Sequence, residues 1–208
     1  MGQSHAHQWM HVLLPALLTA LVQRFGVAEA DAAPVVVPPC AHDGTERRIV
    51  RPQDPAAQAA CESGKTKDHT VKHVLLVNAL LLILVLRDTS GGRTHEKPMA
   101  DATPSPWPAG SRLLQDSGFL VFTLPQGAIL MPTRKPCGQE RPLVQQRANQ
   151  ALPHCRRRIA PVTSSVKRCR IVKDWIRLRK DGVRTRVMAR GCALQNGRVR
   201  LTPGPPVV

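Results

Sequence analysis

The sequence predicts a mixed α/β fold in which short buried strands lie beside helices. Two observations carry this prediction: an apolar run from Val74 to Leu86 in the middle of the chain, and helical spacing of apolar residues near both ends. The chain also contains 19 Pro and 14 Gly among its 208 residues, which favours many short elements over a helical bundle. A chain of this length is expected to form one domain with a small appendage.

The apolar run is predicted to form two neighbouring strands. Its 13 residues are too few for a membrane-spanning helix, which needs about 20. Asn78 marks the expected turn between strands at 69–78 and 80–87, and both are apolar enough to lie inside a sheet. Residues 89–93, which include a Gly-Gly pair, are expected to turn the chain away from the sheet.

Two further strands are predicted, one before this pair in the sequence and one after it. A short strand is expected at residues 35–37. After a Pro-rich loop at 97–112, another short strand is expected to end at Asp116, with Gly118 permitting a tight turn just beyond it. An acid at the end of a buried strand is well placed to present its carboxylate.

Four helices are predicted, at residues 8–23, 143–151, 162–181 and 183–196. Apolar residues at helical spacing support the first and the third. The third has the clearest pattern: Thr163 or Ser164 can cap its start, and Gly182 ends it. The first could instead be a secretory signal, because the length of its apolar run is roughly that of the apolar region of a signal peptide. However, no Lys or Arg precedes that apolar run, which counts against export.

The charge distribution points to a partner that carries phosphate. The net charge is +16, and half of the 30 Lys and Arg residues lie in the segment 154–203. Aromatic residues make up 3% of the chain and Tyr is absent, so few side chains could stack on the bases of a single strand. Duplex DNA is therefore the favoured partner. A ribosomal protein, a membrane-surface protein or a solvated helix face would share this composition.

The six cysteines suggest neither a zinc site nor a disulfide framework. They are scattered without a CxxC pair, which favours reduced thiols in a cytosolic protein.

Five short sequence motifs, in this order along the chain, resemble those of a known protein family. They read DGTERRIVRPQ, SGKTKDHTVKHVLLVNA, DTSGGRTHEK, GSRLLQDSGF and SSVKRCRIVKD, and shorter matches follow in CALQN and LTP. The chain resembles bacterial transposases of the IS5 type, whose DDE endonuclease domain is shared with Harbinger-like elements. The resemblance divides the chain into an N-terminal helical segment and junction at 1–38, a DDE domain at 39–203 and a tail at 204–208.

This resemblance implies an RNase H-like mixed sheet flanked by helices, preceded by a short N-terminal helical segment that is a remnant of a DNA-binding region. It implies an enzyme that cuts double-stranded DNA at transposon ends and joins the ends to a target. The implied cofactor is a divalent cation, Mg²⁺ or Mn²⁺, held between carboxylates. The implied setting is cytoplasmic and nucleoid-associated, without a membrane partner and with a possible homo-oligomer.

The resemblance also assigns site residues. Asp43 matches the first catalytic acid and Asp116 the second, while Glu96 stands at the place of an auxiliary metal-binding acid. The third acid should be a glutamate, but the chain has Ala160 there. In isolation, Asp43 and Asp116 could be turn residues and Glu96 an exposed loop residue. The predicted DNA contacts are Arg156, Arg157, Arg158, Lys167, Arg168, Arg170, Lys173 and Arg177.

The alanine at the third position predicts an impaired enzyme. Because alanine cannot ligate a metal, we expect weak metal binding, retained DNA binding and greatly reduced cleavage. Glu62 and Gly197, which stand where the family has aromatic residues, fit decay of an inactive element. A non-catalytic DNA-binding remnant is the main alternative, and a small basic exported or membrane-associated protein is a third.

Overall fold

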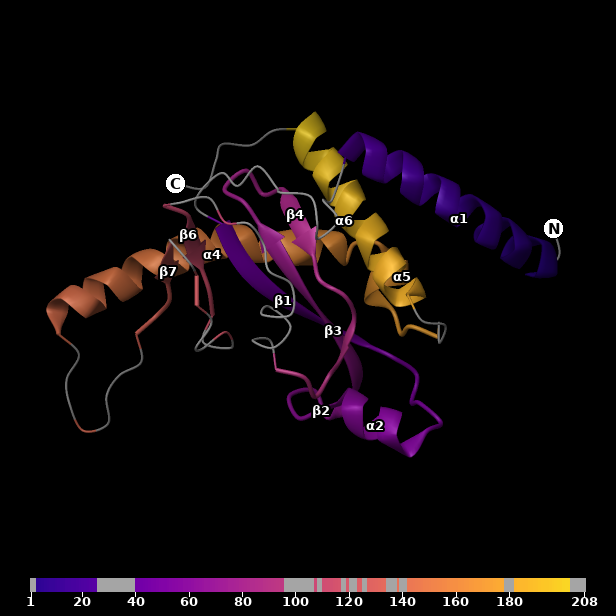
Figure 1. The fold of residues 1–208 in the computed structure, drawn as a ribbon, viewed down its shortest axis with the longest axis horizontal. Coiled ribbons are helices and arrows are strands. Elements are labelled where there is room, and N and C mark those ends of the chain that lie inside the picture. Colours follow the sequence, from indigo (N-terminus) through magenta and orange to yellow (C-terminus); the bar gives the residue numbers. More distant parts are fainter. Residues whose placement is uncertain are drawn as a thin grey trace.

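A mixed sheet covered on one face by two long helices forms the body of the protein (Figure 1). In this computed structural model the described residues are 3–25, 40–95, 107, 110–116, 119, 123–124, 127–133, 138, 142–177 and 182–202. The predicted α/β class with a mixed, helix-flanked sheet is confirmed, and the arrangement is compatible with an RNase H-like fold.

The sheet is built around two long antiparallel strands. Strands β1 (Cys40–Arg48) and β3 (Asp68–Val77) pair from Ala41 opposite Val77 to Arg48 opposite Thr70. On its other side β1 pairs in parallel with β6 (Arg112–Leu114), and β6 pairs in parallel with β7 (Ala128–Leu130). The short strands β2 (Glu62–Ser63), β4 (Ile83–Leu86) and β5 (Ser90–Gly91) each pair with β3.

The predicted strand pair in the apolar run is confirmed. Strands β3 and β4 are antiparallel, and Asn78 makes the turn between them. Its side-chain oxygen accepts hydrogen bonds from the backbone N–H groups of Leu80 and Leu82, each at 3.0 Å. Leu81 takes a left-handed conformation with φ of 64° inside this turn. The asparagine therefore supplies the acceptor that holds an otherwise apolar turn.

The predicted exit from the sheet at residues 89–93 is only partly correct. Ser90 and Gly91 first form β5 on the edge of β3, and the turn follows, with the N–H of Thr94 donating to the carbonyl of Gly91. Glycine is required here because a Cβ on Gly91 would lie 2.3 Å from the carbonyl oxygen of Ala60. The Gly-Gly pair thus permits close approach to the end of α2 (Pro55–Cys61).

The helices at the two ends of the chain are confirmed, and their structured lengths are greater than predicted. Helix α1 spans Gln3–Phe25 and α6 spans Val183–Leu201. Helix α2 was not predicted, although its N-terminus has common helix-start residues. The Asp54 carboxylate accepts from the N–H of Ala57, and Pro55 takes the first helical position.

The predicted helix at 162–181 is wrong. Helix α4 begins at Leu143, where a shorter helix was expected, and continues through Pro153 and Pro161 to Val166. Thr163 therefore lies inside α4 and does not cap a new helix. A four-residue helix α5 (Arg170–Lys173) follows, and Gly182 precedes α6 with φ of 71°.

Extended pairing is the reason why the helix does not continue to residue 181. Ile176 forms a parallel bridge with Ile49, in which its N–H donates to the carbonyl of Arg48 and its carbonyl accepts from the N–H of Val50. The apolar residues Val166, Val172 and Ile176 are all buried as predicted, but a turn and a strand bridge deliver them to the core. Tertiary pairing thus overrides the helical spacing of this segment.

The main core lies between the sheet and the helices α4 and α6. Its buried residues are Ala41, Leu75, Val77, Ile83, Leu114, Ile159, Val162, Val166, Val172, Val187, Met188 and Cys192. Helix α6 approaches α4 and α5 closely at Gly191, where a Cβ would lie 2.9 Å from Val166 Cγ1 and 3.1 Å from Val172 Cγ2. The absence of a Cβ at Gly191 therefore allows these helices to pack this closely.

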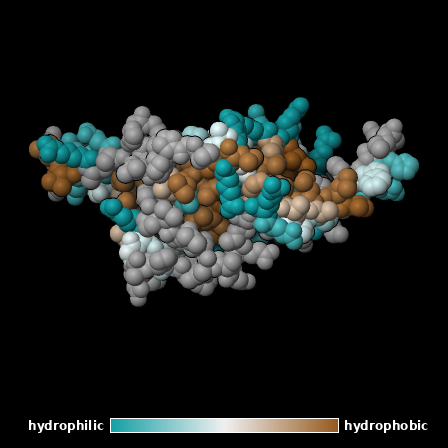
Figure 2. Space-filling view, turned by 90° about the horizontal axis from the view of Figure 1, so that it is seen from above, coloured by the Kyte–Doolittle hydropathy of each residue, from teal (hydrophilic) through white to brown (hydrophobic). Residues whose placement is uncertain are grey.

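Helix α1 packs on the outer side of α6, and its N-terminal end projects beyond it (Figure 1). At the junction the Phe25 ring lies 3.3 Å from the place of a Cβ on Gly197. The Phe25 ring therefore covers this glycine. The projecting part of α1 presents apolar side chains to the surface, including Trp9, Val12 and Leu13 (Figure 2).

Asn196 ties α6 to the sheet and to α1. Its side-chain oxygen accepts from the N–H of Ile83 at 2.8 Å, and its amide donates to the carbonyls of Ile83 at 2.8 Å and Phe25 at 3.4 Å. The residue is almost fully buried. One side chain therefore satisfies the backbone of β4 where that strand begins.

Replacing Asn196 with leucine is expected to destabilise the protein by about 2–5 kcal/mol, because both backbone polar groups of Ile83 would be left buried and unpaired. Urea unfolding followed by circular dichroism measures this change. The control Leu194→Asn, at an exposed position of the same helix, should change the unfolding free energy by less than about 0.5 kcal/mol. Equal stability of the wild-type protein and Asn196→Leu would contradict the role of the amide.

Some predictions fall outside the described residues. These are the strand at 35–37, Gly118 and Glu96. The two apolar runs that suggested export or membrane association form a helix and a strand pair. Among the described residues, we find no helix with the length and apolar character needed to cross a bilayer.

Candidate catalytic site and nucleic-acid interface

Asp43 lies in β1, and Asp116 lies two residues beyond the end of β6, the parallel neighbour of β1. The register pairs Cys40 with Leu113 and Ala41 with Leu114. The next pair is marked by a side-chain contact of 3.0 Å between His42 Nδ1 and Gln115 Nε2. Continuing the register by one residue places Asp43 opposite Asp116, and neighbouring strands are about 4.8 Å apart.

The two aspartates belong to the face of the sheet that α4 covers. Side chains alternate along a strand, so Asp43 shares the face of Ala41 and Asp116 shares the face of Leu114. Ala41 and Leu114 both lie in the core cluster beneath α4 and α6. Each aspartate is half-buried. The fold therefore brings together two acids that are 73 residues apart in the chain.

Helix α4 lies directly over Asp43. The Thr163 hydroxyl donates to Asp43 Oδ2 at 2.9 Å and also lies 2.9 Å from the carbonyl oxygen of Ala160. Ala160 is exposed, whereas its neighbour Ile159 is buried in the core. Residues 160, 163 and 167 are spaced to share one face of a helix. Position 160 thus lies one turn from the contact with Asp43 and has room for a longer side chain.

Lys167 brings a positive charge to the same face. Its ammonium group donates to the carbonyl of Glu46 at 3.3 Å, three residues beyond Asp43 along β1. Partial burial lowers the pKa of Lys167, while the negative charges of Asp43 and Glu46 oppose that shift. The lysine therefore stands within electrostatic reach of Asp43.

The donor set fits a divalent cation incompletely. Two carboxylates from neighbouring segments are hard oxygen ligands of the kind that Mg²⁺ and Mn²⁺ prefer. Within the described ranges no group of three or more His, Cys, Asp or Glu side chains gathers around one point. Glu96 lies outside those ranges, and Ala160 offers no side-chain ligand. Asp43 and Asp116 are thus the described residues that would hold a cation.

His42 lies on the opposite face of the sheet from the two aspartates. Its ring packs against Phe119 at 5.2 Å and edge-on to Trp107 at 6.1 Å. Burial, with a smaller effect of Arg87, lowers the pKa of His42 to about 3. The ring is therefore neutral at physiological pH and packs against its aromatic neighbours.

A second buried histidine lies farther along the aspartate face. His73 Nε2 is 2.7 Å from Arg47 Nη2, which also donates to the carbonyl of Arg184 at 3.0 Å. Arginine can only donate, so His73 Nε2 accepts and the ring proton is on Nδ1, which faces the carbonyl of Arg87 at 3.4 Å. Burial is the main reason why the pKa of His73 falls to about 3. The sequence did not reveal this network because Arg47 and His73 are 26 residues apart and meet only through the pairing of β1 with β3.

The predicted DNA contacts gather in part around the turn between α4 and α5. A hollow of about 670 Å³ is lined by Ser164, Lys167, Arg168, Arg170, Lys173 and Asp174. Four of its six lining residues are cationic, and Arg170 is also paired with Asp174 at 3.4 Å. Arg177 is exposed a few residues farther on. Arg156, Arg157 and Arg158 belong to α4, but their side chains lie outside the described part of the structure.

Comparison with known families agrees with this arrangement. Residues 42–196 match the DDE superfamily endonuclease family, and the match includes Asp43, Asp116 and the turn between α4 and α5. The chain belongs to this family. No similar protein was found among curated proteins, and no similar fold among solved structures.

Family membership supports a nuclease or transposase domain whose substrate is DNA. The matched range begins at His42 in β1 and ends at Asn196 in α6, so it contains most of the sheet, all of α4 and most of α6. Helix α1 precedes it. Two residues on this face were not assigned to the site from the sequence: Thr163, which was expected to cap a helix and lies beside Asp43, and the buried Arg47. The spacing from 160 to 167 could have indicated Thr163, had α4 been predicted to full length.

Proposed function

We propose that this chain is a transposase-type DDE endonuclease of the IS5 and Harbinger-like group. Its substrate is double-stranded DNA at transposon ends, and its reaction is cleavage followed by strand transfer. Residues 39–203 form the catalytic domain, residues 1–38 an N-terminal helical remnant, and residues 204–208 a tail. We further propose that cleavage by this copy is impaired because Ala160 replaces the third acid.

The observation that carries this proposal is the position of Asp43 in β1 and of Asp116 just beyond β6, its parallel neighbour, where Gln115 contacts His42. A DDE reaction needs acids from separate strands to converge with one from a final helix. Here α4 crosses Asp43 at Thr163 and offers position 160 one turn away. This arrangement supports Asp43 and Asp116 as two of the three proposed acids, and Ala160 stands at the proposed third position.

The protein groups would act mainly through position and charge. When bound, Mg²⁺ or Mn²⁺ supplies Lewis acidity that polarises the scissile phosphate and lowers the pKa of the attacking water. The Thr163 hydroxyl orients the Asp43 carboxylate by occupying one lone pair of Oδ2. Lys167 adds positive charge where phosphate charge would otherwise be uncompensated. Ala160 leaves a cation without one of its anchors.

A non-catalytic DNA-binding remnant is the second candidate function, favoured by Ala160. Such a protein would occupy transposon ends or interfere with an active oligomer, and it would retain the basic residues around the α4–α5 turn. Both candidates place the chain in the cytoplasm in association with the nucleoid. They differ in whether any cation-dependent cleavage remains.

We expect the chain to bind duplex DNA while cutting it at a rate close to background. Fluorescence anisotropy should give a Kd of about 1–100 µM for duplex DNA near physiological salt, and binding should weaken as the salt concentration rises. Transposon-end DNA incubated with Mg²⁺ or Mn²⁺ should show little nicking, and Asp43→Asn should remove what remains.

The outcomes separate the candidates. Residual nicking that Asp43→Asn abolishes supports an impaired enzyme, and nicking indistinguishable from that of Asp43→Asn supports the non-catalytic remnant. Robust nicking by the protein as given would show that Ala160 does not impair it. Failure to bind duplex DNA would overturn both.

A further inference from the structure

We infer that the tip of the β2–β3 hairpin, residues 64–67, is a second DNA-backbone contact. The inference rests on the proposed function, and it adds an element that is far from the α4–α5 turn in sequence. The tip carries Lys65 and Lys67, both exposed, and contains no acid. Lysine ammonium groups on an exposed turn are suited to phosphate oxygens and do not require base recognition.

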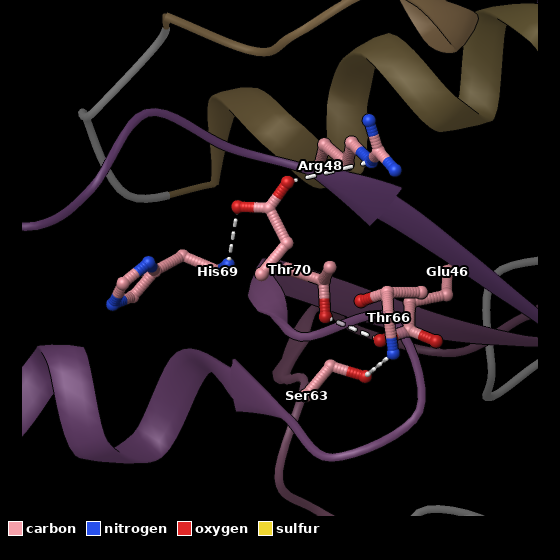
Figure 3. A network of polar contacts seen from close by, with 7 residues as sticks. Glu46, Arg48, Ser63, Thr66, His69 and Thr70 are labelled. Carbon is pink, nitrogen blue, oxygen red and sulfur yellow. Dashed lines mark hydrogen bonds and ion pairs between the residues drawn. The ribbon is translucent and has the colours of Figure 1, made fainter.

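The hairpin tip has a defined shape. Ser63 is buried, and its hydroxyl accepts from the N–H of Thr66 at 3.4 Å, while its carbonyl accepts from the N–H of Lys67 at 2.9 Å. Lys67 has φ of 55°, in the left-handed region. Figure 3 shows Ser63 beneath Thr66 in this turn. The two lysines are therefore presented from a hydrogen-bonded turn at the end of β3.

The acids at the base of the hairpin are already engaged. Asp68 forms an ion pair with Arg48 at 3.4 Å and accepts from the N–H of His69 at 2.8 Å. Glu46 accepts from the Thr70 hydroxyl (Figure 3). Glu62, on β2, is the exposed acid of this hairpin. Because Asp68 and Glu46 are held by other groups, the charges of the tip lysines remain available to an external anion.

The base of the hairpin lies beside the end of β1 that is five residues beyond Asp43. Along β1, Thr163 contacts Asp43, Lys167 contacts Glu46, and the hairpin base is paired to Arg48. The positive charge of Lys65 helps to lower the pKa of Lys167, although burial is the main cause, so the two lysines are electrostatic neighbours. The chain thus aligns an acid, a helix lysine and the hairpin tip along one strand.

This alignment predicts where on the DNA the tip would act. From Asp43 to Arg48 the extended strand advances about 17 Å, at roughly 3.3 Å per residue. One DNA strand carries a phosphate for every 3.4 Å of helix axis, so the tip would contact phosphates on the order of five nucleotides from the one at Asp43. The hairpin would thereby hold the duplex beside the cleavage point.

The test compares two pairs of substitutions that remove equal charge. The hairpin variant is Lys65→Gln with Lys67→Asn, because asparagine tolerates the left-handed backbone at position 67. The control variant is Arg112→Gln with Arg198→Gln, two exposed residues outside the hairpin and the hollow described above. Binding of a 30-base-pair duplex by each full-length protein is measured by anisotropy across a salt series.

We expect the hairpin variant to weaken binding and to lower the slope of log K against log salt by about 2, since each lost phosphate contact lowers it by about 0.9. The control variant should retain the wild-type slope. Equal slopes for the hairpin variant and the wild-type protein would overturn the contact, as would equal losses in the two variants. In either case wild-type binding would persist, so the failure is distinguishable from failure of the proposed function, in which the wild-type protein itself does not bind.

Should the hairpin variant unfold, as judged by its thermal midpoint, Lys65→Gln alone provides the measurement. This single change is on an exposed side chain with an ordinary backbone conformation, and the expected decrease in slope is then about 1. An unchanged slope for Lys65→Gln would again contradict the inference.

Discussion

Replacing Ala160 with glutamate is expected to raise Mn²⁺-dependent nicking of transposon-end DNA by at least about tenfold, which corresponds to about 1.4 kcal/mol of transition-state stabilisation. The reason is positional. Position 160 is exposed on α4, one turn before the Thr163 hydroxyl that contacts Asp43. A carboxylate there would add a third hard ligand beside Asp43 and Asp116, and the rate gain follows from better retention of the cation.

The matched control for this substitution is Ala160→Gln. Glutamine has the same length and a helix propensity close to that of glutamate, but its neutral amide is a poorer ligand for a hard cation. The double variant Ala160→Glu with Asp43→Asn should lose the gained activity, because both carboxylates serve one site.

A binding measurement separates metal capture from catalysis. Ala160→Glu should show a larger increase in thermal midpoint on addition of Mn²⁺ than Ala160→Gln, since a ligand that binds the folded state stabilises it. Equal nicking and equal midpoint shifts in the two variants would remove position 160 from the proposed site.

Acidification is expected to unfold the protein through its two buried histidines. His42 and His73 have pKa values lowered from 6.5 to about 3 in the folded protein, chiefly by burial. Below pH 6.5 the unfolded chain binds protons that the folded protein does not, so stability decreases as pH falls through the window from about 6.5 to about 3. Between pH 7 and pH 5 the expected loss is about 2 kcal/mol for each histidine.

Urea unfolding at pH 7, 6 and 5 measures this dependence in a range where ordinary carboxylates stay ionised. His73→Gln keeps an acceptor for Arg47 and cannot titrate, so it should remove about half of the loss. The control His95→Asn replaces an exposed histidine and should retain the whole pH dependence. The same loss in the wild-type protein and in His73→Gln would show that His73 is not held neutral by the fold.

Turn residues and apolar spacing predicted those elements whose local conformational preference agrees with the tertiary structure. Asn78 between two apolar segments predicted the β3–β4 pair, and its side chain does hold that turn. The spacing of apolar residues predicted α1. The ordered motifs around Asp43 and Asp116 indicated the DDE family before the fold was considered, and the family match at 42–196 confirms that much. The IS5 type and the loss of activity remain predictions.

It failed where long-range contacts decide the local conformation. The apolar residues from Val166 to Ile176 read as one helix face, but Ile176 pairs with β1, and that pairing ends the helical segment early. The Gly91–Gly92 pair read as a turn, but its first residue pairs with β3 because the backbone of α2 packs against it. Buried Arg47 gave no signal, since its contacts with His73 and Arg184 are distant in sequence.

The amino-acid sequence by itself determined the chemistry that is available: two aspartates in segments that resemble the DDE family, an alanine at position 160, and a strong excess of positive charge. Only the tertiary structure decided which of these groups meet. The parallel pairing of β1 and β6 brings the segment that carries Asp116 alongside β1, and the packing of α4 brings Thr163 and Lys167 to β1. Strand register and helix packing depend on side chains throughout the core, which is why no local pattern could reveal these contacts.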